Sequence, residues 1–435
     1  MSKLKQKLLE KTAILGVVGL GYVGLPLAVE KAKAGYKTIG FDIQESKVSM
    51  VNIGKNYIGD VVNEDLMAIV QSGYLSATTD FAEVALADCV CICVPTPLDA
   101  YQQPDISYVK ASAESIVPYM HKDMLIVLES TTYPGTTEEL LKPILESSGL
   151  KCGVDFYLAF SPERVDPGNL IYKTKNTPKV VGGITDQCTE LAATMYESIL
   201  EAPIHRVSSP AVAEMEKILE NIYRNVNIGL VNELAMLCNK MGINFWEVID
   251  AAKSKPYGFQ AFYPGPGLGG HCIPLDPYYL SWKAREFGFH TSMIEASMMV
   301  NDRMPEYCVE RASRILNRYK KAMNGARVLV LGVAYKQDIS DYRVSPAIRV
   351  IEELEKEGVE VVYYDPFVPE YRQHGNIIIG EIELTAELIE NADMVMITTA
   401  HSKVDYDFVQ KHAKIIFDTK NAMKSVNDRG NIELL

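Results

Sequence analysis

The sequence predicts an α/β protein in which two doubly wound parallel-sheet domains are joined by a helical middle domain. Three observations support this prediction. Apolar, strand-like runs alternate with helical patterns over the first 205 residues, a long helical pattern follows, and the strand-helix alternation resumes near residue 323. We therefore expect domains at 1–205, 206–322 and 323–435, which agrees with a length of 435 residues at about 150 residues per domain.

The first domain begins with a continuous apolar run at 13–19, as expected of a strand buried on both faces of a parallel sheet. A helix is expected from about Gly24 to Ala34, where Gly35 ends it, and a second strand at 37–42. The next apolar runs predict strands at 88–94, 124–128, 156–160 and 179–182.

The middle domain is predicted to contain a helix of about 30 residues, roughly 45 Å long at about 1.5 Å per residue. Ser209 can cap this helix, Pro210 suits its first position, and Gly242 ends the pattern. A helix of this length is expected to act as a spine that joins domains or as a dimer surface. Strands of the third domain are expected at 327–332, 360–364, 394–398 and 414–417.

Charge and cysteine content exclude several classes of protein. With 43 Lys and Arg against 56 Asp and Glu, the net charge of −13 would repel nucleic acid and anionic lipid. The eight cysteines form no CxxC pair and no zinc-type cluster, so we expect reduced thiols in a cytoplasmic protein and no metal. The uncharged stretch 12–29 resembles a membrane span, but its four glycines and Pro26 favour a strand, a turn and a helix start.

A glycine turn points to a dinucleotide. Gly19, Gly21 and Gly24, with Tyr22 and Val23 between the last two, follow a strand and open a helix. Such glycines permit the turn and let a pyrophosphate approach the helix N-terminus. Asp42 ends the next strand, where a carboxylate binds ribose hydroxyls and repels a 2′-phosphate, so NAD is favoured over NADP.

The two sheet domains are therefore predicted to be Rossmann-like, but only the first carries this turn. The third domain repeats the strand pattern and has Gly332-Val-Ala-Tyr-Lys336 in place of the glycine turn. Cys89, Cys91 and Cys93 alternate along a strand and are interpreted as core residues.

A second glycine cluster contains a candidate nucleophile. Gly265, Gly267, Gly269 and Gly270 precede Cys272, and Pro274 is expected to begin a helix. A helix N-terminus lowers the pKa of a nearby thiol, which suits a nucleophile. The alternative is a buried cysteine beside a flexible loop, but the four glycines, which place the thiol next to an anion-binding loop, favour the nucleophile.

Other candidate groups lie on the long helix and at strand ends. Lys217 and Asn221, four residues apart, share a helix face, and this pattern alone is also that of an ordinary solvated face. Ser130-Thr131-Thr132 and Ser161-Pro-Glu163-Arg164 follow strands, where an open sheet presents groups to its ligand.

Together these motifs resemble the UDP-glucose/GDP-mannose dehydrogenase family, in the family's order from about residue 12 to the C-terminus. The resemblance rests on the glycine turn with Asp42, Val94-Pro95-Thr96-Pro97, Ser130-Thr131 with Pro134-Gly135, Ser161-Pro-Glu163, Lys217 with Asn221, the Gly265 to Cys272 segment with Asp276, and Ala334-Tyr-Lys336-Gln-Asp338 with Arg343-Val-Ser-Pro346.

The resemblance implies oxidation of the C6 alcohol of a nucleotide sugar to a carboxylate with two NAD+. We also expect a homodimer or a higher homo-oligomer. Cys272 would form a thiohemiacetal and then a thioester that water cleaves. Lys217 and Asn221 would stabilise the oxyanion, Asp276 would move protons through a water, and Glu163 with Thr131 would assist base catalysis or position water.

The resemblance also implies the binding residues. For the cofactor they are Gly19, Gly21, Tyr22, Val23, Gly24, Asp42, Pro95, Thr96, Thr131 and Arg343. For the substrate they are Glu163, Arg164, Lys217, Asn221, Gly265, Gly267, Gly269, Gly270 and Lys336.

The residues around the nucleophile depart from the UDP-glucose pattern, which has Ser before the cysteine, Phe after it and Lys before the aspartate. Here those positions hold His271, Ile273 and Leu275. This is similar to the branch acting on UDP-N-acetylhexosamines, most closely the UDP-N-acetylglucosamine 6-dehydrogenases of bacterial surface-polysaccharide pathways. His271 is not expected to be the base for Cys272, because adjacent side chains rarely face each other.

Other functions are left open. UDP-glucose, UDP-N-acetylgalactosamine and UDP-N-acetylmannosamine are alternative substrates. A β-hydroxyacid dehydrogenase shares the first two domains but needs neither Cys272 nor a third domain. A non-catalytic NAD-binding sensor would keep the glycine turn and have no reason for the Lys, Asn, Cys and Asp set.

Overall fold

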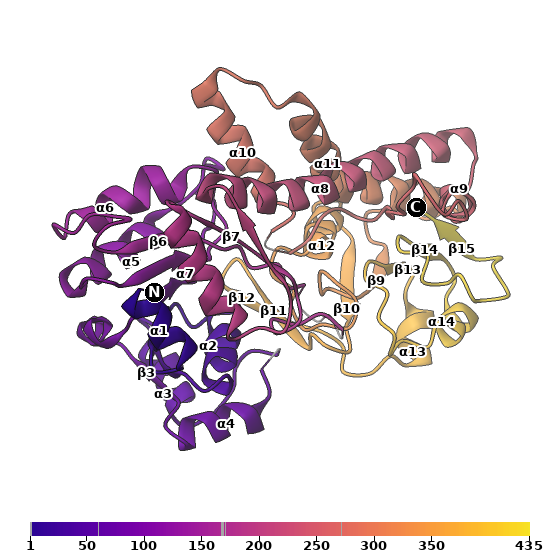
Figure 1. The fold of residues 1–435 in the computed structure, drawn as a ribbon. Coiled ribbons are helices and arrows are strands. Elements are labelled where there is room, and N and C mark those ends of the chain that lie inside the picture. Colours follow the sequence, from indigo (N-terminus) through magenta and orange to yellow (C-terminus); the bar gives the residue numbers. More distant parts are fainter. Residues whose placement is uncertain (1, 60, 167–168, 170, 271) are drawn as a thin grey trace. The chain divides into compact units, whose positions relative to one another are not determined.

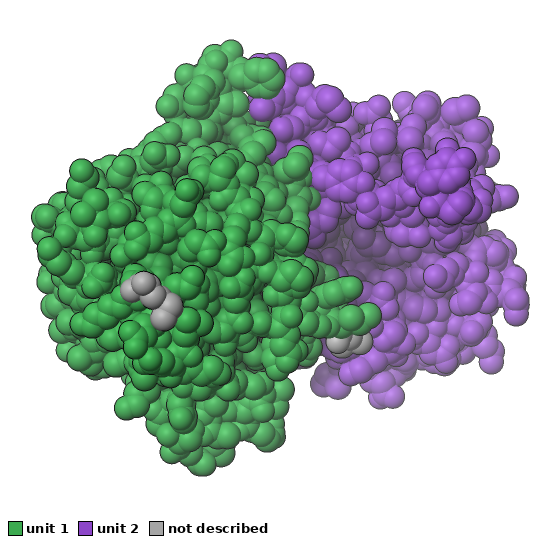
Figure 2. Space-filling model, in the orientation of Figure 1, with its two compact units in different colours: residues 1–220, 278–289 green, residues 221–277, 290–435 purple. Residues whose placement is uncertain are grey.

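The computed structural model describes residues 2–59, 61–166, 169, 171–270 and 272–435. The chain divides into two compact units (Figure 2). Unit 1 comprises residues 1–220 and 278–289, and unit 2 comprises residues 221–277 and 290–435.

Unit 1 is built on an eight-stranded sheet (Figure 1). In spatial order its strands are β3 (Leu75–Thr78), β2 (Lys37–Phe41), β1 (Ile14–Val18), β4 (Cys89–Ile92), β5 (Leu125–Leu128), β6 (Tyr157–Phe160), β7 (Lys179–Gly183) and β8 (Ile204–Val207). The predicted doubly wound sheet is confirmed, with one antiparallel pair, β6 with β7. That pair turns back because the described residues between the two strands form no helix that could cross over the sheet.

Helices cover both faces of this sheet, as the apolar strands require. They are α1 (Lys3–Leu9), α2 (Gly24–Lys33), α3 (Glu45–Asn52), α4 (Asn63–Gln71), α5 (Ser107–Ile116), α6 (Lys142–Glu146) and α7 (Asp186–Glu197), with short helical turns at Phe81–Leu86, Val117–Tyr119 and Thr136–Leu141. Cys89, Cys91 and Cys93 join the core under α2 and α7, whereas Val90 and Ile92 join the core under α5. The interpretation of the three cysteines as core residues is confirmed.

The uncharged stretch 12–29 forms β1, the glycine turn and the start of α2. Among the described residues no helix combines the length and apolarity that crossing a membrane demands.

The predicted long helix is α8 (Pro210–Met241), which has 32 residues. The Ser209 hydroxyl accepts a hydrogen bond from the Val212 amide at 3.3 Å, as a capping residue does. The other helices of the middle region are α9 (Phe245–Ala252), α10 (Asp276–Ala284), the short turn Arg285–Phe287 and α11 (Ser292–Arg318).

Unit 2 contains a second, five-stranded sheet that is parallel throughout. Its strands in spatial order are β10 (Glu360–Tyr364), β9 (Arg327–Leu331), β13 (Met394–Ile397), β14 (Ile416–Asp418) and β15 (Ile432–Leu434). α11 and α12 (Pro346–Lys356) cover one face, and α13 (Ala386–Asn391) and α14 (Tyr406–His412) cover the other. A hairpin of β11 (Glu370–Gln373) and β12 (Asn376–Ile379) turns through His374 and Gly375, both at positive φ.

Candidate active site

The three positions of the turn after β1 require glycine for different physical reasons. A Cβ added to Gly19, whose φ is +90°, would lie 2.7 Å from the Cys93 carbonyl oxygen, and one added to Gly24 would lie 1.8 Å from the Gly19 oxygen. A Cβ on Gly21 would meet no atom within 4 Å. The packing of the chain itself therefore requires glycine at 19 and 24. Gly21 leaves open the space that a pyrophosphate fills in dinucleotide-binding turns.

Asp42 lies directly after β2 and faces the same turn. One carboxylate oxygen accepts the Leu20 amide at 2.9 Å, and the other accepts the Gln44 amide at 2.9 Å. The Lys47 ammonium lies 3.4 Å away. At the start of α2, Tyr22 is half exposed and Val23 is the N-cap residue. The residues present therefore suit the adenosine ribose and pyrophosphate of NAD.

We expect Asp42→Ala to weaken NAD+ binding by about 10- to 100-fold, because charged hydrogen bonds contribute about 1.5–3 kcal/mol each. The same change should improve NADP+ relative to NAD+, since the carboxylate that repels a 2′-phosphate is removed. Titration of both cofactors measures this. Asp42→Asn keeps an acceptor without the charge and separates the two effects. Equal affinity of the unmodified protein for both cofactors would contradict the assignment.

Glu163 and Lys217 meet in unit 1. The Lys217 ammonium donates to the Glu163 carbonyl at 2.5 Å, and the Glu163 carboxylate accepts the amides of Arg164 and Val165 at 2.8 and 2.9 Å. Burial raises the pKa of Glu163, but the Lys179 ammonium, these amides and Lys217 outweigh it and hold that pKa below its ordinary value. Glu163 is therefore an ionised carboxylate that can accept protons or orient water.

Lys179, the first residue of β7, supports Glu163 and was not foreseen from the sequence. Its buried ammonium lies 2.7 Å from Glu129 and 3.6 Å from Glu163. The Tyr196 hydroxyl donates to the other oxygen of Glu129. A lysine opening a strand that is otherwise wholly apolar was the available signal, because a buried cation needs an anionic partner.

Thr131 and Thr132 follow β5. The Thr96 hydroxyl donates to the Thr131 carbonyl at 2.7 Å, and the Tyr279 hydroxyl donates to the Thr96 carbonyl, next to the exposed Pro95. The Thr132 hydroxyl is buried without a hydrogen-bond partner in the part of the chain that the structure describes. It is therefore a further candidate for orienting a water or a ligand atom.

The guanidinium of Arg164 is engaged by the protein itself. It pairs with Glu220, lies 3.4 Å from Glu216 and donates to the Pro178 carbonyl at 3.0 Å. The role of Arg164 in substrate binding stays a prediction. Because its guanidinium is occupied, the backbone of Arg164 would make the contact with the substrate.

In unit 2, Cys272 is exposed and lies in the turn before α10. Its carbonyl accepts the amides of Leu275 at 3.1 Å and Asp276 at 2.9 Å. The helix begins at Asp276, two residues after the predicted start at Pro274, because this turn, anchored on the Cys272 carbonyl, comes first. His271 lies outside the described residues.

Asn221 is oriented within unit 2 from both ends of its amide. Its nitrogen donates to the Asp276 carboxylate, and its oxygen accepts from Arg224. Asn221 and Asp276 are buried. Asp276 therefore lies where α10 starts, linked to the helix that also carries Lys217.

Further buried amides of α8 fix both ends of the nucleophile segment and were missed from the sequence. The Asn225 side chain donates to the Ile273 carbonyl at 3.1 Å, next to Cys272. The Asn232 side chain accepts the Gly265 amide at 3.0 Å. Ser297 and Asn301 of α11 bond to Asn225, and Asn301 accepts from Asn232. Each asparagine alone resembled an ordinary helix residue, so the sequence held no local signal.

The glycine segment packs against the loop that carries Lys336. An added Cβ on Gly269 would lie 2.6 Å from the Tyr335 Cβ, and one on Gly270 would lie 3.1 Å from the Tyr335 ring. At Gly267, φ is +132° and an added Cβ would lie 3.1 Å from Pro346. The glycine segment and the Lys336 loop thus form one surface in unit 2.

Two basic residues are associated with this surface: Lys420 lies beside Gly265, and Arg343 follows the Lys336 loop in the sequence. A Cβ on Gly265 would lie 2.5 Å from the ammonium of Lys420, whose pKa is lowered by burial. Sequence reasoning missed Lys420, which comes two residues after the end of β14. Arg343 donates to the Asp341 carboxylate at 2.7 and 2.9 Å.

The two units hold different functional groups. Unit 1 holds the dinucleotide turn, Glu163 and Lys217. Unit 2 holds a thiol at the start of a helix, the Asn221 and Asp276 pair, and a glycine surface with cations. The groups of unit 1 can bind a dinucleotide, and those of unit 2 can add a thiol to a carbonyl and bind a phosphate.

Comparison with known proteins gives one consistent result. Three family models, the NAD binding, central and UDP binding domains of the UDP-glucose/GDP-mannose dehydrogenase family, match residues 13–200, 211–303 and 329–425. A UDP-N-acetyl-D-glucosamine 6-dehydrogenase of Pseudomonas aeruginosa is 38% identical over 81% of this chain and 83% of its own.

Among solved structures, a UDP-D-ManNAc dehydrogenase from Pyrococcus horikoshii has a TM-score of 0.87 at 32% identity and covers 97% of this chain and 98% of its own. An NDP-N-acetyl-D-galactosaminuronic acid dehydrogenase from Methanosarcina mazei Go1 has a TM-score of 0.83 at 31% identity, covering 100% of this chain and 97% of its own. The first domain is thus an NAD-binding domain, and the chain belongs to the UDP-glucose/GDP-mannose dehydrogenase family.

Proposed function

We propose that the protein oxidises the C6 hydroxyl of a UDP-N-acetylhexosamine, with UDP-N-acetylglucosamine as the preferred sugar, to the uronic acid for bacterial surface-polysaccharide synthesis. The observation that carries this proposal is the exposed thiol of Cys272 at the start of α10, with Asn221 and Asp276 paired at the helix start. A dehydrogenase that stops at an aldehyde or ketone has no use for that thiol.

The reaction proceeds through two hydride transfers. NAD+ supplies the hydride acceptor in both. In the first, the C6 alcohol loses a hydride and its hydroxyl proton and becomes an aldehyde. The Cys272 sulfur then adds to the aldehyde carbon and gives a thiohemiacetal. Loss of a second hydride and a proton gives a thioester. Water then attacks the thioester carbon and the carbon-sulfur bond breaks. One proton of the water returns to the Cys272 sulfur, the other is lost, and the uronic acid leaves as its carboxylate.

The chain's own residues support the charges that develop. Lys217 and the Asn221 amide are assigned to the oxyanion of the thiohemiacetal and of the thioester hydrolysis. Asp276 is assigned to proton transfer through a water. Glu163, ionised by its neighbours, is assigned with Thr131 to base catalysis or to holding the water. Lys336 and Lys420 are assigned to the diphosphate, which a chain of net charge −13 must attract locally.

The sugar specificity rests on the residues around Cys272 and on the names of relatives. Relatives of 34–38% identity are named for UDP-N-acetyl-D-glucosamine or for UDP-N-acetyl-D-mannosamine. An acetamido group at C2 needs room and a polar partner, because an unpaired buried amide costs on the order of 1–3 kcal/mol. The residues at positions 271, 273 and 275 and the names of these relatives support an N-acetylated substrate.

We expect kcat/KM for UDP-N-acetylglucosamine to exceed that for UDP-glucose by about 10- to 200-fold. UDP-N-acetylgalactosamine should be the nearest competitor, because it keeps the same C2 group. A panel of these sugars with UDP-N-acetylmannosamine, assayed by NADH formation, measures the preference. A value for UDP-glucose that equals or exceeds those for the N-acetylated sugars would refute the assignment to this branch.

The protein is further proposed to be a cytoplasmic homodimer. Val212, Leu219, Tyr223, Leu230, Leu237 and Met241 are exposed and recur on one face of α8. An apolar stripe of this length supports a second copy of the chain as its partner. We expect light scattering to give twice the monomer mass of 48.4 kDa, and Leu230→Glu to reduce it. A monomeric mass for the unmodified protein would contradict the dimer.

A further inference from the structure

Asp365, directly after β10, is a buried anchor for the loop that follows β9. One of its oxygens accepts the amides of Val333 at 2.7 Å and Ala334 at 3.0 Å. The other accepts the amides of Phe367 at 2.8 Å and Val368 at 3.1 Å. Burial raises the pKa of Asp365, but the hydrogen bond from His401 and these amides hold it below its ordinary value.

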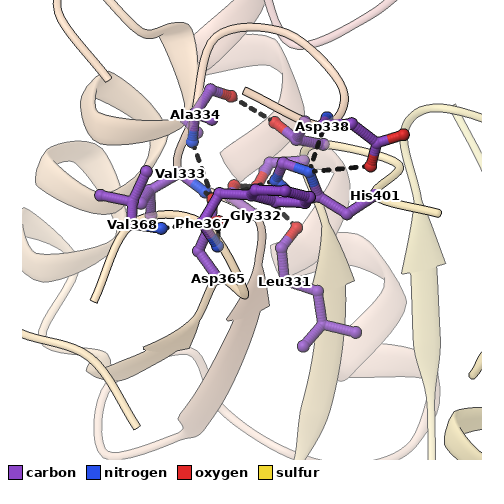
Figure 3. Close-up of polar contacts among 12 residues, drawn as sticks. Leu331, Gly332, Val333, Ala334, Asp338, Asp365, Phe367, Val368 and His401 are labelled. Carbon is purple, nitrogen blue, oxygen red and sulfur yellow. Dashed lines mark hydrogen bonds and ion pairs between the residues drawn. The ribbon is translucent and has the colours of Figure 1, made fainter. Parts of the chain in front are cut away.

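His401, which follows β13, joins Asp365 to the same loop at a second point (Figure 3). Its Nε2 lies 3.0 Å from Asp365 Oδ2, and its Nδ1 lies 3.0 Å from the Asp338 amide nitrogen. An amide can only donate, so Nδ1 is the acceptor and the ring proton is on Nε2, which donates to Asp365. The buried ring is thus held as the neutral Nε2-H tautomer.

Neighbours of His401 hold the same loop. The Thr399 hydroxyl donates to the Ala334 carbonyl at 2.6 Å, and the Ser402 amide donates to the Asp338 carboxylate at 2.8 Å. Thr399 and Ser402 therefore bond to the loop on either side of Lys336. Tyr335, in the middle of this loop, packs against Gly269 and Gly270.

The corresponding acid of unit 1 is used differently. Asp42 also follows the second strand of its sheet and accepts an amide of the preceding turn, but no histidine contacts it among the described residues. Asp365 has five hydrogen-bond donors around its two oxygens and a fully buried side chain. In the second sheet both carboxylate oxygens therefore accept hydrogen bonds from the protein itself, and the carboxylate is not available to a ribose.

We infer that His401 is a positioning residue for the nucleotide sugar, an inference that rests on the proposed function. By joining Asp365 to the Asp338 amide it fixes the 333–338 loop, which presents Lys336 and supports the glycine segment beside Cys272. The His401 ring bonds to Asp365 and Asp338 of unit 2, and the cofactor turn belongs to unit 1. Its loss is therefore expected to weaken the binding of the uridine diphosphate part and to leave NAD+ binding unchanged.

The test compares His401→Ala, His401→Asn and His401→Gln with His412→Gln, a histidine on α14 paired with Glu390 at 2.7 Å. Asparagine can accept from the Asp338 amide but cannot reach Asp365, and glutamine can donate to Asp365 but cannot replace Nδ1.

Calorimetry with UDP and with NAD+ measures each site without turnover. We expect His401→Ala to weaken UDP by about 10-fold or more, Asn and Gln each to restore part of the affinity, and His412→Gln to change nothing.

Several results would overturn the inference. One is a His401→Ala variant that binds UDP as tightly as the unmodified protein, and another is an equal loss of NAD+ affinity, which would indicate general destabilisation. If the variants do not fold, 15N spectra of the unmodified protein still identify the protonated ring nitrogen, and a proton on Nδ1 refutes the geometry. Failure of the unmodified protein to bind UDP also refutes it. An unmodified protein that binds UDP but oxidises no UDP-N-acetylhexosamine contradicts the proposed function alone.

Discussion

Cys272→Ala is expected to lower the rate of carboxylate formation by about 1,000-fold or more, as removal of a covalent nucleophile does. Without the thiol no thiohemiacetal forms, so the second hydride has no covalent precursor from which to leave. Cys272→Ser should fail as well, because an alkoxide is a poorer leaving group than a thiolate. NAD+ binding should survive, since the glycine turn belongs to unit 1 and Cys272 to unit 2.

The matched control is Cys238→Ala, a half-buried cysteine on α8 of the same unit. Uronic acid formed per minute and NAD+ affinity are measured for both variants. Wild-type production of the acid by Cys272→Ala would eliminate the covalent mechanism.

Lys217→Met is expected to lower kcat by about 100- to 1,000-fold, the usual effect of removing a donor to an oxyanion. The Lys217 ammonium is buried and is held at 2.5 Å by the Glu163 carbonyl, so its position is fixed before any oxyanion develops. Methionine keeps the length of the side chain without the charge. KM for the UDP-sugar should change far less than kcat, because the charge acts on a group that exists only during the reaction.

Lys240→Met, an exposed change on the same helix, is the control for effects on α8. Thermal unfolding of both variants separates catalysis from stability, because the Glu163 carbonyl loses its partner only in the first. An unchanged kcat for Lys217→Met would remove this residue from the oxyanion site.

Long apolar runs made most of the fold predictable. β1, β4 and β5 are buried on both faces, so their composition alone distinguishes them from loops. β3 was not foreseen, because its exposed serine and its threonine leave no continuous apolar run. β15 has three residues and completes an edge, and pairing with β14, rather than its own sequence, makes it a strand.

The site was predictable where its chemistry is local in the sequence. The glycine turn with Asp42 is a short pattern, and so is the glycine segment before Cys272. The start of α10 was placed two residues early, because the turn that precedes it depends on the Cys272 carbonyl.

The supporting residues could not be found because they act across long sequence separations. Lys179 and Glu129 are 50 residues apart, Asn225 and Ile273 are 48 apart, and His401 and Asp365 are 36 apart. Lys179 differs from its apolar strand, but nothing in the sequence indicates its partner. Asn225 and His401 are unremarkable residues until folding places their partners beside them. These pairings become visible only in the folded structure.

The ratio of NADH formed to UDP-sugar consumed tests the four-electron oxidation most directly. A limiting amount of UDP-N-acetylglucosamine is incubated with excess NAD+ until absorbance stops rising, and the remaining sugar and the acid are quantified. Two NADH and one uronic acid per sugar are expected. A ratio of one would indicate a single oxidation, as in a β-hydroxyacid dehydrogenase, and a ratio of zero with every UDP-sugar would indicate a protein that only binds NAD.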